Sequence, residues 1–239
     1  MPKSESKLVR TRRERVNVIL PLLKQAYPHA KCSLNFTTPL ELLVATILSA
    51  QCTDERVNIV TIELFKRFRT AQDYADAPQE EVERYIKSAG FFRAKATNIR
   101  AMAAALVERH GGVVPRTMEE LHALAGVGRK TANVVLGNAF DINIGVTVDT
   151  HVTRLGNRLG LTKHPSDAVK IEQDLIPIVP QDEWTLWSHL LIHHGRAVCQ
   201  ARKPLCEACV LLPCCPTGPA VLRERAEAEA AVTKRLRKA

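Results

Sequence analysis

The sequence lacks the features that mark membrane-spanning, secreted and repeat proteins. No apolar run reaches the roughly 18 residues that a membrane-spanning helix requires. The N-terminal stretch MPKSESKLVRTRRERVNVILPLL carries positive charge but no uninterrupted apolar region followed by a small-residue cleavage site. No internal repeat and no low-complexity core segment is found. These absences predict a protein of the reducing cytosol or nucleus.

Acidic residues are outnumbered, and this imbalance points to an anionic partner. The 239 residues include 34 Lys and Arg against 25 Asp and Glu, a net charge of +9. A basic surface of this size attracts polyanions, which makes nucleic acid the first candidate partner. Charge alone leaves the point open, because many basic proteins bind nothing anionic. The apolar content of 46% excludes disorder for most of the chain and permits one large domain or two small ones.

Runs of alternating β-branched residues are short and few, whereas apolar positions recur at spacings of three and four. This pattern predicts a nearly all-α protein. Thr38-Pro39-Leu40-Glu41 has the form of a capping box and predicts a helix to Gln51, and Thr117 with Glu120 opens another. Further helices are expected over residues 9–26, 54–69, 80–89, 93–110, 129–139, 150–159, 167–178 and 183–194.

Both ends of the chain are basic. Residues 1–15 carry six basic side chains against two acidic ones, and residues 223–239 carry six against three. We interpret them as appended tails, each a solvated helix or a disordered end, in preference to a dedicated DNA-binding arm.

Residues 119–136, EELHALAGVGRKTANVVL, predict two helices joined by a tight turn at Gly126-Val127-Gly128. Glycines permit such a turn, and their exposed amides can approach a phosphate closely. A lone Gly-x-Gly also suits an ordinary turn between helices. Here Arg129 and Lys130 follow at the positive end of the second helix, where cations are disfavoured unless an anion or a reaction requires them.

Lys130 and Asp149 are the candidate catalytic pair. The helix dipole and Arg129 both disfavour the ammonium form of Lys130, and the neutral amine is a nucleophile. Asp149 ends the apolar stretch Val146–Val148 and precedes a helical pattern. The alternatives are an ordinary surface lysine and an aspartate that only caps a helix.

Seven cysteines, an odd number unevenly distributed, argue against a disulfide framework. Cys199, Cys206, Cys209 and Cys215 form the pattern C-x6-C-x2-C-x5-C. Four thiolates can hold a zinc ion or an iron–sulfur cluster, although zinc sites more often pair two short knuckles and only one short pair exists here. Cys214 is an extra thiol or a substitute for Cys215.

Several motifs together resemble the endonuclease III family of DNA glycosylases over roughly residues 15–217. They are TPLELLVATILSAQCTD at 38–54, LAGVGRKTANVVL at 124–136, VDTHV at 148–152 and the cysteine cluster. The resemblance implies a bifunctional enzyme of base excision repair that removes oxidised pyrimidines from duplex DNA. Lys130 would attack the sugar C1′ and form a Schiff base, Asp149 would stabilise the sugar cation or accept protons, and β-elimination would cleave the abasic site on its 3′ side.

The resemblance also assigns DNA contacts and a cofactor. Gln51 and Phe91 would fill the void left by the extruded base, although a helix end and a buried loop anchor are the structural alternatives. Phe91 departs from the aliphatic residue expected there. The cysteine spacing implies a [4Fe–4S] cluster, whose stiff loop would present Arg202 and Lys203 to phosphates alongside the contacts of the hairpin turn, namely Gly126, Gly128 and Arg129. His193 and His194 are interpreted as structural or solvent-facing.

The architecture implied by the resemblance is two helical domains with a DNA cleft between them. Residues 32–142 would form a barrel-like helical domain with the helix-hairpin-helix, and 143–217 the cluster domain, against which residues 1–31 pack. Residues 218–239 would be a basic tail. The 19-residue separation of Lys130 and Asp149 is one residue longer than usual, and the 141–145 loop is expected to absorb it. A monomeric, prokaryotic, nucleoid-associated cytoplasmic protein with no membrane partner is expected.

Two alternatives remain at this point. An adenine-mismatch glycosylase shares the hairpin, the aspartate and the cluster, but lacks a lysine at the position of Lys130 and has an additional C-terminal domain for which this chain is too short. A noncatalytic DNA-binding module would use the hairpin and a zinc knuckle, and the joint presence of Lys130 and Asp149 argues against it.

Overall fold

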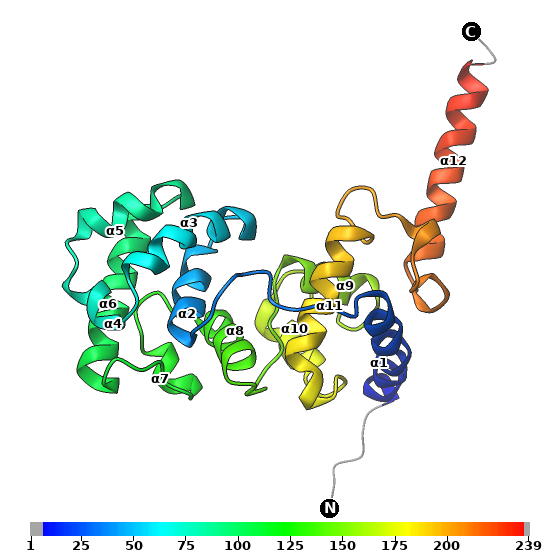
Figure 1. The fold of residues 1–239 in the computed structure, drawn as a ribbon. Helices are drawn as coiled ribbons and strands as arrows, with labels where there is room; N and C mark the ends of the chain where they lie inside the picture. Colours follow the sequence, from blue (N-terminus) through cyan, green and yellow to red (C-terminus); the bar gives the residue numbers. More distant parts are fainter. Residues whose placement is uncertain (1–6, 237–239) are drawn as a thin grey trace, which may run out of the picture. The chain divides into compact units, whose positions relative to one another are not determined.

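The computed structural model describes residues 7–236, with side chains from 11 to 232, so residues 1–6 and 237–239 of the basic tails lie outside the described residues. All regular elements in the described part are helical, as the sequence predicts (Figure 1). The α-helices are α1 (Lys7–Ala26), α2 (Pro39–Leu48), α3 (Asp54–Arg67), α4 (Ala71–Asp76), α5 (Gln79–Ile86), α6 (Phe92–His110), α7 (Met118–His122), α8 (Arg129–Ala139), α9 (Thr150–Arg158), α10 (Ala168–Leu175), α11 (Trp184–Ala197) and α12 (Gly218–Leu236). Short 3-10 turns are η1 (Lys87–Ala89), η2 (Gln181–Glu183), η3 (Cys206–Ala208) and η4 (Leu212–Cys214). Across residues 7–236, no helix combines the length and apolarity needed to cross a membrane.

The chain forms two compact units. The first, called the hairpin unit below, is Cys32–Ile144. The second, called the cysteine unit, consists of the chain up to Lys31 together with the chain from Gly145 onward. Each unit has its own hydrophobic core, so each positions its functional side chains independently.

The hairpin unit is built around α2. Every side chain of this helix from Leu42 to Leu48 is buried, and a helix that is apolar on all sides must be covered on all sides. Helices α3, α6 and α8 pack against it. Thr38 begins α2 as predicted, because its side-chain oxygen accepts the Glu41 backbone N–H at 3.1 Å. Because α8, the second helix of the hairpin, packs against the buried α2, this packing positions α8 within the unit.

Helix α6 supplies the other half of this core. Its buried face consists of Lys95, Ala96, Ile99, Met102, Ala103 and Leu106. These positions follow the spacing of three and four residues that the sequence shows. The helix packs against α4 and α5.

The sequence analysis did not identify α4. Its start is a reciprocal capping box in which Thr70 accepts from the Asp73 N–H and the Asp73 carboxylate accepts from the Thr70 N–H. The backbone N–H of Thr70 is the largest cause that lowers the pKa of the Asp73 carboxylate, and the backbone N–H of Arg69 also lowers it. Aspartate in the place of the usual glutamate, and a helix of six residues, made the pattern easy to overlook.

The cysteine unit packs α1 and α9 against α11, with α10 against α9. The indole of Trp187 on α11 is fully buried at its centre. The buried Arg12 of α1 forms an ion pair with Asp174 of α10 at 3.3 Å, and Asp174 also accepts the Thr162 hydroxyl at 2.7 Å. The N-terminal helix is therefore an integral part of this unit.

Four predicted helix ends differ from the observed ones by three residues, among them that of the helix expected over 183–194, which continues to Ala197. The helix expected to reach Gln51 ends at Leu48, where the Ser49 hydroxyl donates to the carbonyl of Thr46 at 2.8 Å and closes the last turn. The helix expected over 80–89 ends at Ile86 and continues as the 3-10 turn η1. The helix expected over 167–178 ends at Leu175. Helix ends depend on local hydrogen bonds that apolar spacing does not encode.

Candidate functional site

The hairpin turn depends on Gly126. Its φ is +74°, and a Cβ there would lie 2.9 Å from Cβ of Asn98 on α6, so a side chain is excluded by both backbone conformation and packing. Gly128 differs, because a Cβ there would meet nothing within 4 Å. The fold therefore requires the first glycine, whereas the second leaves open space beside the backbone.

Helix α8 begins directly after this turn. Gly128 is its N-cap residue and provides no side-chain cap. Arg129 and Lys130 occupy the first turn, and both are exposed. A helix N-terminus that carries exposed cations and no acidic side chain is suited to an anion.

Asp149 is the N-cap residue of α9. Its Oδ1 accepts the backbone N–H of Val152 at 2.8 Å, and its side chain is half-buried. The capping role that the sequence allowed is therefore present. Capping occupies one carboxylate oxygen, so it does not by itself exclude a chemical role.

Two groups near Asp149 were not singled out from the sequence. His189 on α11 has its pKa lowered to about 4, mainly by burial and further by His193, while Asp149 acts in the opposite direction. His189 is therefore neutral near pH 7. Burial is the main cause that lowers the pKa of Arg154 on α9, and the charge of Asp149 acts in the opposite direction. In the sequence, Arg154 is marked only by a second arginine, Arg158, one helical turn later.

Gln51 and Phe91 share an uncommon backbone conformation. Both have positive φ, +53° and +46°. Asp141 is the third non-glycine residue of this kind in the described part of the chain. Such a conformation costs on the order of 1 kcal/mol or more and tends to persist at functional positions. Gln51 is exposed, and Phe91 is 69% exposed, so Phe91 is not the buried loop anchor that the sequence left open.

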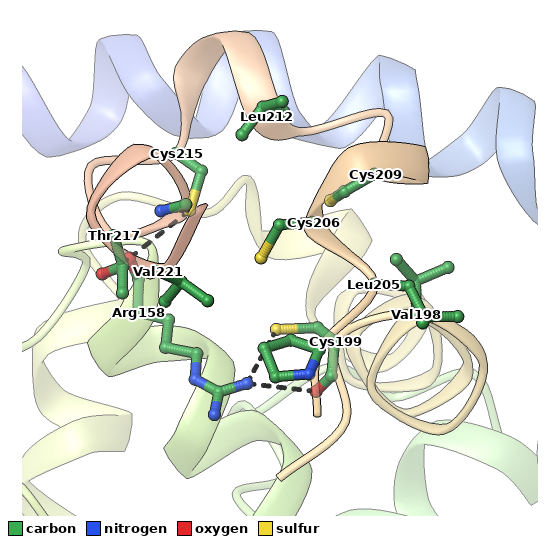
Figure 2. Close-up of a pocket in the computed structure, with 12 residues that line it drawn as sticks. Arg158, Val198, Cys199, Leu205, Cys206, Cys209, Leu212, Cys215, Thr217 and Val221 are labelled. Atoms are coloured by element: carbon green, nitrogen blue, oxygen red, sulfur yellow. Dashed lines mark hydrogen bonds between the residues drawn. The ribbon is translucent and has the colours of Figure 1, made fainter. Parts of the chain in front are cut away.

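Four cysteines line one cavity of about 30 Å³ in the cysteine unit (Figure 2). They are Cys199, Cys206, Cys209 and Cys215. Most of the other lining residues are apolar, among them Leu205, Leu212 and Val221, and Arg158 and Thr217 also line the cavity. Cys214 does not line the cavity, and its thiol donates to the carbonyl of Leu211 at 3.3 Å.

As the structure places them, the four cysteines do not form a metal site. Among the residues that the structure describes, no three His, Cys, Asp or Glu side chains are arranged to hold a metal ion. Burial raises the pKa of both Cys206 and Cys209. Thiolates in such surroundings therefore need compensating positive charge or hydrogen-bond donors.

Donors to the sulfur atoms are present. Arg158 of α9 donates to Sγ of Cys199 at 3.3 Å, a contact visible in Figure 2. The backbone N–H of Gly218 donates to Sγ of Cys215 at 3.3 Å. His194, interpreted from the sequence as structural or solvent-facing, is buried and lies 3.4 Å from Sγ of Cys209. Its other ring nitrogen contacts the hydroxyl of Tyr27 at 2.9 Å, and burial lowers its pKa to about 4.

The loop between the first two cysteines is held from both sides. Arg158 donates to the carbonyls of Gln200 at 2.7 Å and Ala201 at 2.8 Å. Arg225 of α12 donates to the carbonyl of Pro204 at 2.7 Å. The next two residues after Ala201, Arg202 and Lys203, are exposed. The C-terminal segment, expected to be an appended tail that is either a solvated helix or disordered, is the helix α12, and its Arg225 restrains this loop.

The structure brings the predicted residues together in groups. The hairpin unit holds Gly126, Gly128, Arg129 and Lys130 at one turn. It also holds the strained pair Gln51 and Phe91. The cysteine unit holds Asp149, the four cavity cysteines and the exposed Arg202 and Lys203. Lys130 and Asp149 thus come from different units.

Known proteins are similar over most of this chain. The profile of the HhH-GPD superfamily of base excision DNA repair proteins matches residues 44–181. Endonuclease III of Synechocystis sp. is 55% identical over 210 residues, which cover 88% of this chain and 95% of that protein.

Solved structures agree with this match. An endonuclease III in a non-covalent DNA complex and one in a trapped covalent DNA intermediate each superpose with a TM-score of 0.83 at 42% identity. Each covers 88% of this chain and 98% of the solved chain. The hairpin turn, the capping aspartate and the ring of cysteines thus occur in a chain that belongs to the endonuclease III family, within the HhH-GPD superfamily of base excision DNA repair proteins.

Proposed function

We propose that this protein is a bifunctional DNA glycosylase and abasic-site lyase of base excision repair, acting on oxidised pyrimidines in duplex DNA. The observation that carries the proposal is Lys130, an exposed amine in the first turn of a helix whose N-terminus has no side-chain cap. Family membership supports the activity. The bacterial relatives support a prokaryotic source, and action on DNA there implies a nucleoid-associated location.

The Lys130 amine attacks C1′ of the damaged nucleotide, and the bond from C1′ to the base breaks with its electron pair leaving on the base. Opening of the sugar ring gives an imine between Lys130 and C1′. The imine acidifies the C2′ proton, whose removal expels the 3′ phosphate, and water then releases the lysine. Lys95 is a poor candidate for this role, because it is 5% exposed and its Nζ donates to two backbone carbonyls.

The carboxylate of Asp149 stabilises the positive charge that develops on the sugar as the base leaves. Because burial lowers the pKa of His189 to about 4, this histidine adds no positive charge near the carboxylate at pH 7. Oδ1 of Asp149 accepts the backbone N–H of Val152, and this hydrogen bond fixes the orientation of the carboxylate.

The turn at Gly126 and Gly128 and the side chain of Arg129 bind DNA phosphates in this proposal. Open space beside Gly128 permits a phosphate oxygen to approach the backbone closely. Arg202 and Lys203 add exposed positive charge on a restrained loop, so phosphate binding orders few additional bonds.

Replacing Lys130 tests the covalent step. Borohydride reduction should join the wild-type protein irreversibly to damaged duplex DNA, and Lys130→Gln should abolish the adduct while retaining DNA binding, because the glycine turn is unchanged. Gel electrophoresis after reduction measures the adduct. Wild-type levels of trapping by the Lys130→Gln protein would assign the chemistry to another amine.

The two roles of Asp149 are separable by substitution. Asp149→Asn retains an oxygen for the Val152 N–H, whereas Asp149→Ala loses the cap and should lower the free energy of unfolding by about 1 kcal/mol. Both should strongly reduce base release in single-turnover assays, although only the alanine variant should show the larger stability loss in urea. Wild-type base release by Asp149→Asn would leave the residue with a capping role alone.

Gln51 and Phe91 extrude the damaged nucleotide in this proposal. A base inside a duplex is out of reach of a nucleophile, and flipping it leaves a void that a side chain fills. The exposed ring of Phe91 is suited to stacking between bases. Positive φ at both positions directs these side chains in a way that an ordinary helix or turn residue would not.

Phe91→Ala should reduce activity on a paired lesion more than on a preformed abasic site. Extrusion costs a few kcal/mol and least where no base is stacked, so the difference between substrates is expected to be on the order of tenfold. Single-turnover rates on two otherwise identical duplexes give this ratio. Equal losses on both duplexes would argue for a folding role of Phe91.

The four cavity cysteines fit an iron–sulfur cluster in this proposal. Zinc sites more often pair two short cysteine knuckles, whereas Cys206 and Cys209 are the only short pair among these four cysteines. Arg158 and the backbone N–H of Gly218 donate to two of the sulfur atoms, and such donors are compatible with cluster-bound thiolates. When bound, a [4Fe–4S] cluster supplies a rigid anchor for the loop that carries Arg202 and Lys203.

Anaerobically purified protein should contain about four iron and four sulfide per chain. Cys215→Ser should lower this content, whereas Cys214→Ser, the matched control beside it, should leave it unchanged because Cys214 does not line the cavity. Iron and acid-labile sulfide analysis measures both. Stoichiometric zinc without sulfide would contradict the cluster.

A further inference from the structure

Lys95 is a buried cation that the proposed chemistry does not use. It lies in the first turn of α6 on the face that packs into the core, among Ala96 and Ile99, and only 5% of it is exposed. A lysine at such a position is costly to bury unless its ammonium group is compensated. Its compensation therefore indicates what it does.

The partners of Lys95 are two helix ends. Its Nζ donates to the carbonyl of Leu48 at 2.8 Å and to the carbonyl of Ala89 at 2.8 Å. Leu48 is the last residue of α2, and Ala89 is the last residue of η1. Carbonyls at a helix C-terminus lack partners within the helix and carry partial negative charge, so one cation satisfies both ends.

The same two ends lead into the strained residues. Gln51 follows Leu48 by three residues, and Phe91 follows Ala89 by two. A chain of two or three residues spans at most about 10 Å, which leaves little freedom between the anchored carbonyl and the exposed side chain. The positive φ values of both residues persist only where the surroundings hold them.

We infer that Lys95 is a positioning residue that joins the two loops carrying Gln51 and Phe91, so that both side chains enter the duplex as one unit. The inference rests on the proposed extrusion role of these two residues. Without the shared ammonium group, each loop would be anchored separately, and the two side chains would no longer be fixed relative to each other. The sequence signal is a lysine within the apolar stripe of residues 92–106.

Lys95→Met tests the inference, because it keeps the length of the side chain and removes every N–H donor. Hydrogen exchange of backbone amides should accelerate by about tenfold or more in residues 49–53 and 89–92, since bonds to a charged donor are lost. Leu106→Ala is the control. It creates a cavity three turns later in the same helix and should not accelerate these two loops selectively.

Activity provides the second measurement. Lys95→Met should reproduce the substrate selectivity of Phe91→Ala, with about tenfold greater loss on a paired lesion than on an abasic site. Combined with Phe91→Ala, it should add less than its separate effect, because the two changes remove one shared function. Leu106→Ala should lower both rates equally.

The outcomes separate the two ideas. Unchanged exchange in both loops, or equal losses on both substrates when Phe91→Ala is selective, would overturn the role of Lys95. If Phe91→Ala itself shows no selectivity, the extrusion role fails regardless of Lys95. Should Lys95→Met not fold, Lys95→Gln removes the charge and shortens the side chain, so selective acceleration of the same loops is expected. A uniform increase across Cys32–Ile144, or no increase in these loops, would overturn the inference.

Discussion

Burial of α2 is the constraint on which the hairpin unit depends. Because its side chains from Leu42 to Leu48 are all enclosed, the helix cannot shift without opening the core on several sides. Helix α8 packs against α2, and this contact sets the position of Lys130 in the first turn of α8. Its C-terminal carbonyl meets the ammonium group of Lys95, so the same buried helix also sets the loop that carries Gln51.

The cysteine unit depends on arginines in a comparable way. Arg154 and Arg158 extend from α9, whose first turn is capped by Asp149, to the backbone around Cys199. The helix that orients the proposed catalytic carboxylate is therefore the helix that holds the first cysteine and the loop after it. A change in α9 would affect both, although Asp149 and Cys199 lie 50 positions apart in the sequence.

Strain and compensation occur together in the hairpin unit. Gln51 and Phe91 adopt conformations that are unfavourable for side chains, and a buried cation binds the carbonyls just before each of them. Gly126 shows the opposite solution, because there the chain uses the one residue that tolerates both positive φ and close contact with Asn98. Where glycine is absent, the surrounding fold must supply the energy that holds the backbone.

The sequence by itself determined the helical class, most helix positions and the residues to consider at the site. Capping residues and apolar spacing act locally, so Thr38, Thr117 and the glycine turn could be interpreted from neighbouring residues. The cysteine spacing indicated a four-ligand set ending in Cys215 and left Cys214 as an extra thiol or a substitute. The tertiary structure separates the two, because Cys215 lines the cavity whereas the thiol of Cys214 donates to the carbonyl of Leu211.

The tertiary structure also decided the features that depend on contacts between residues far apart in the sequence. Lys95 in an apolar stripe, Arg158 beside Cys199 and the helical C-terminal segment have partners far away in the sequence, and no local pattern names those partners. The end of α2 at Leu48 and the exposure of Phe91 likewise follow from the packing around them. Local hydrogen bonds and periodicity depend on residues that are close together in the sequence. The compensation of a buried charge depends on partners that meet only when the chain has folded.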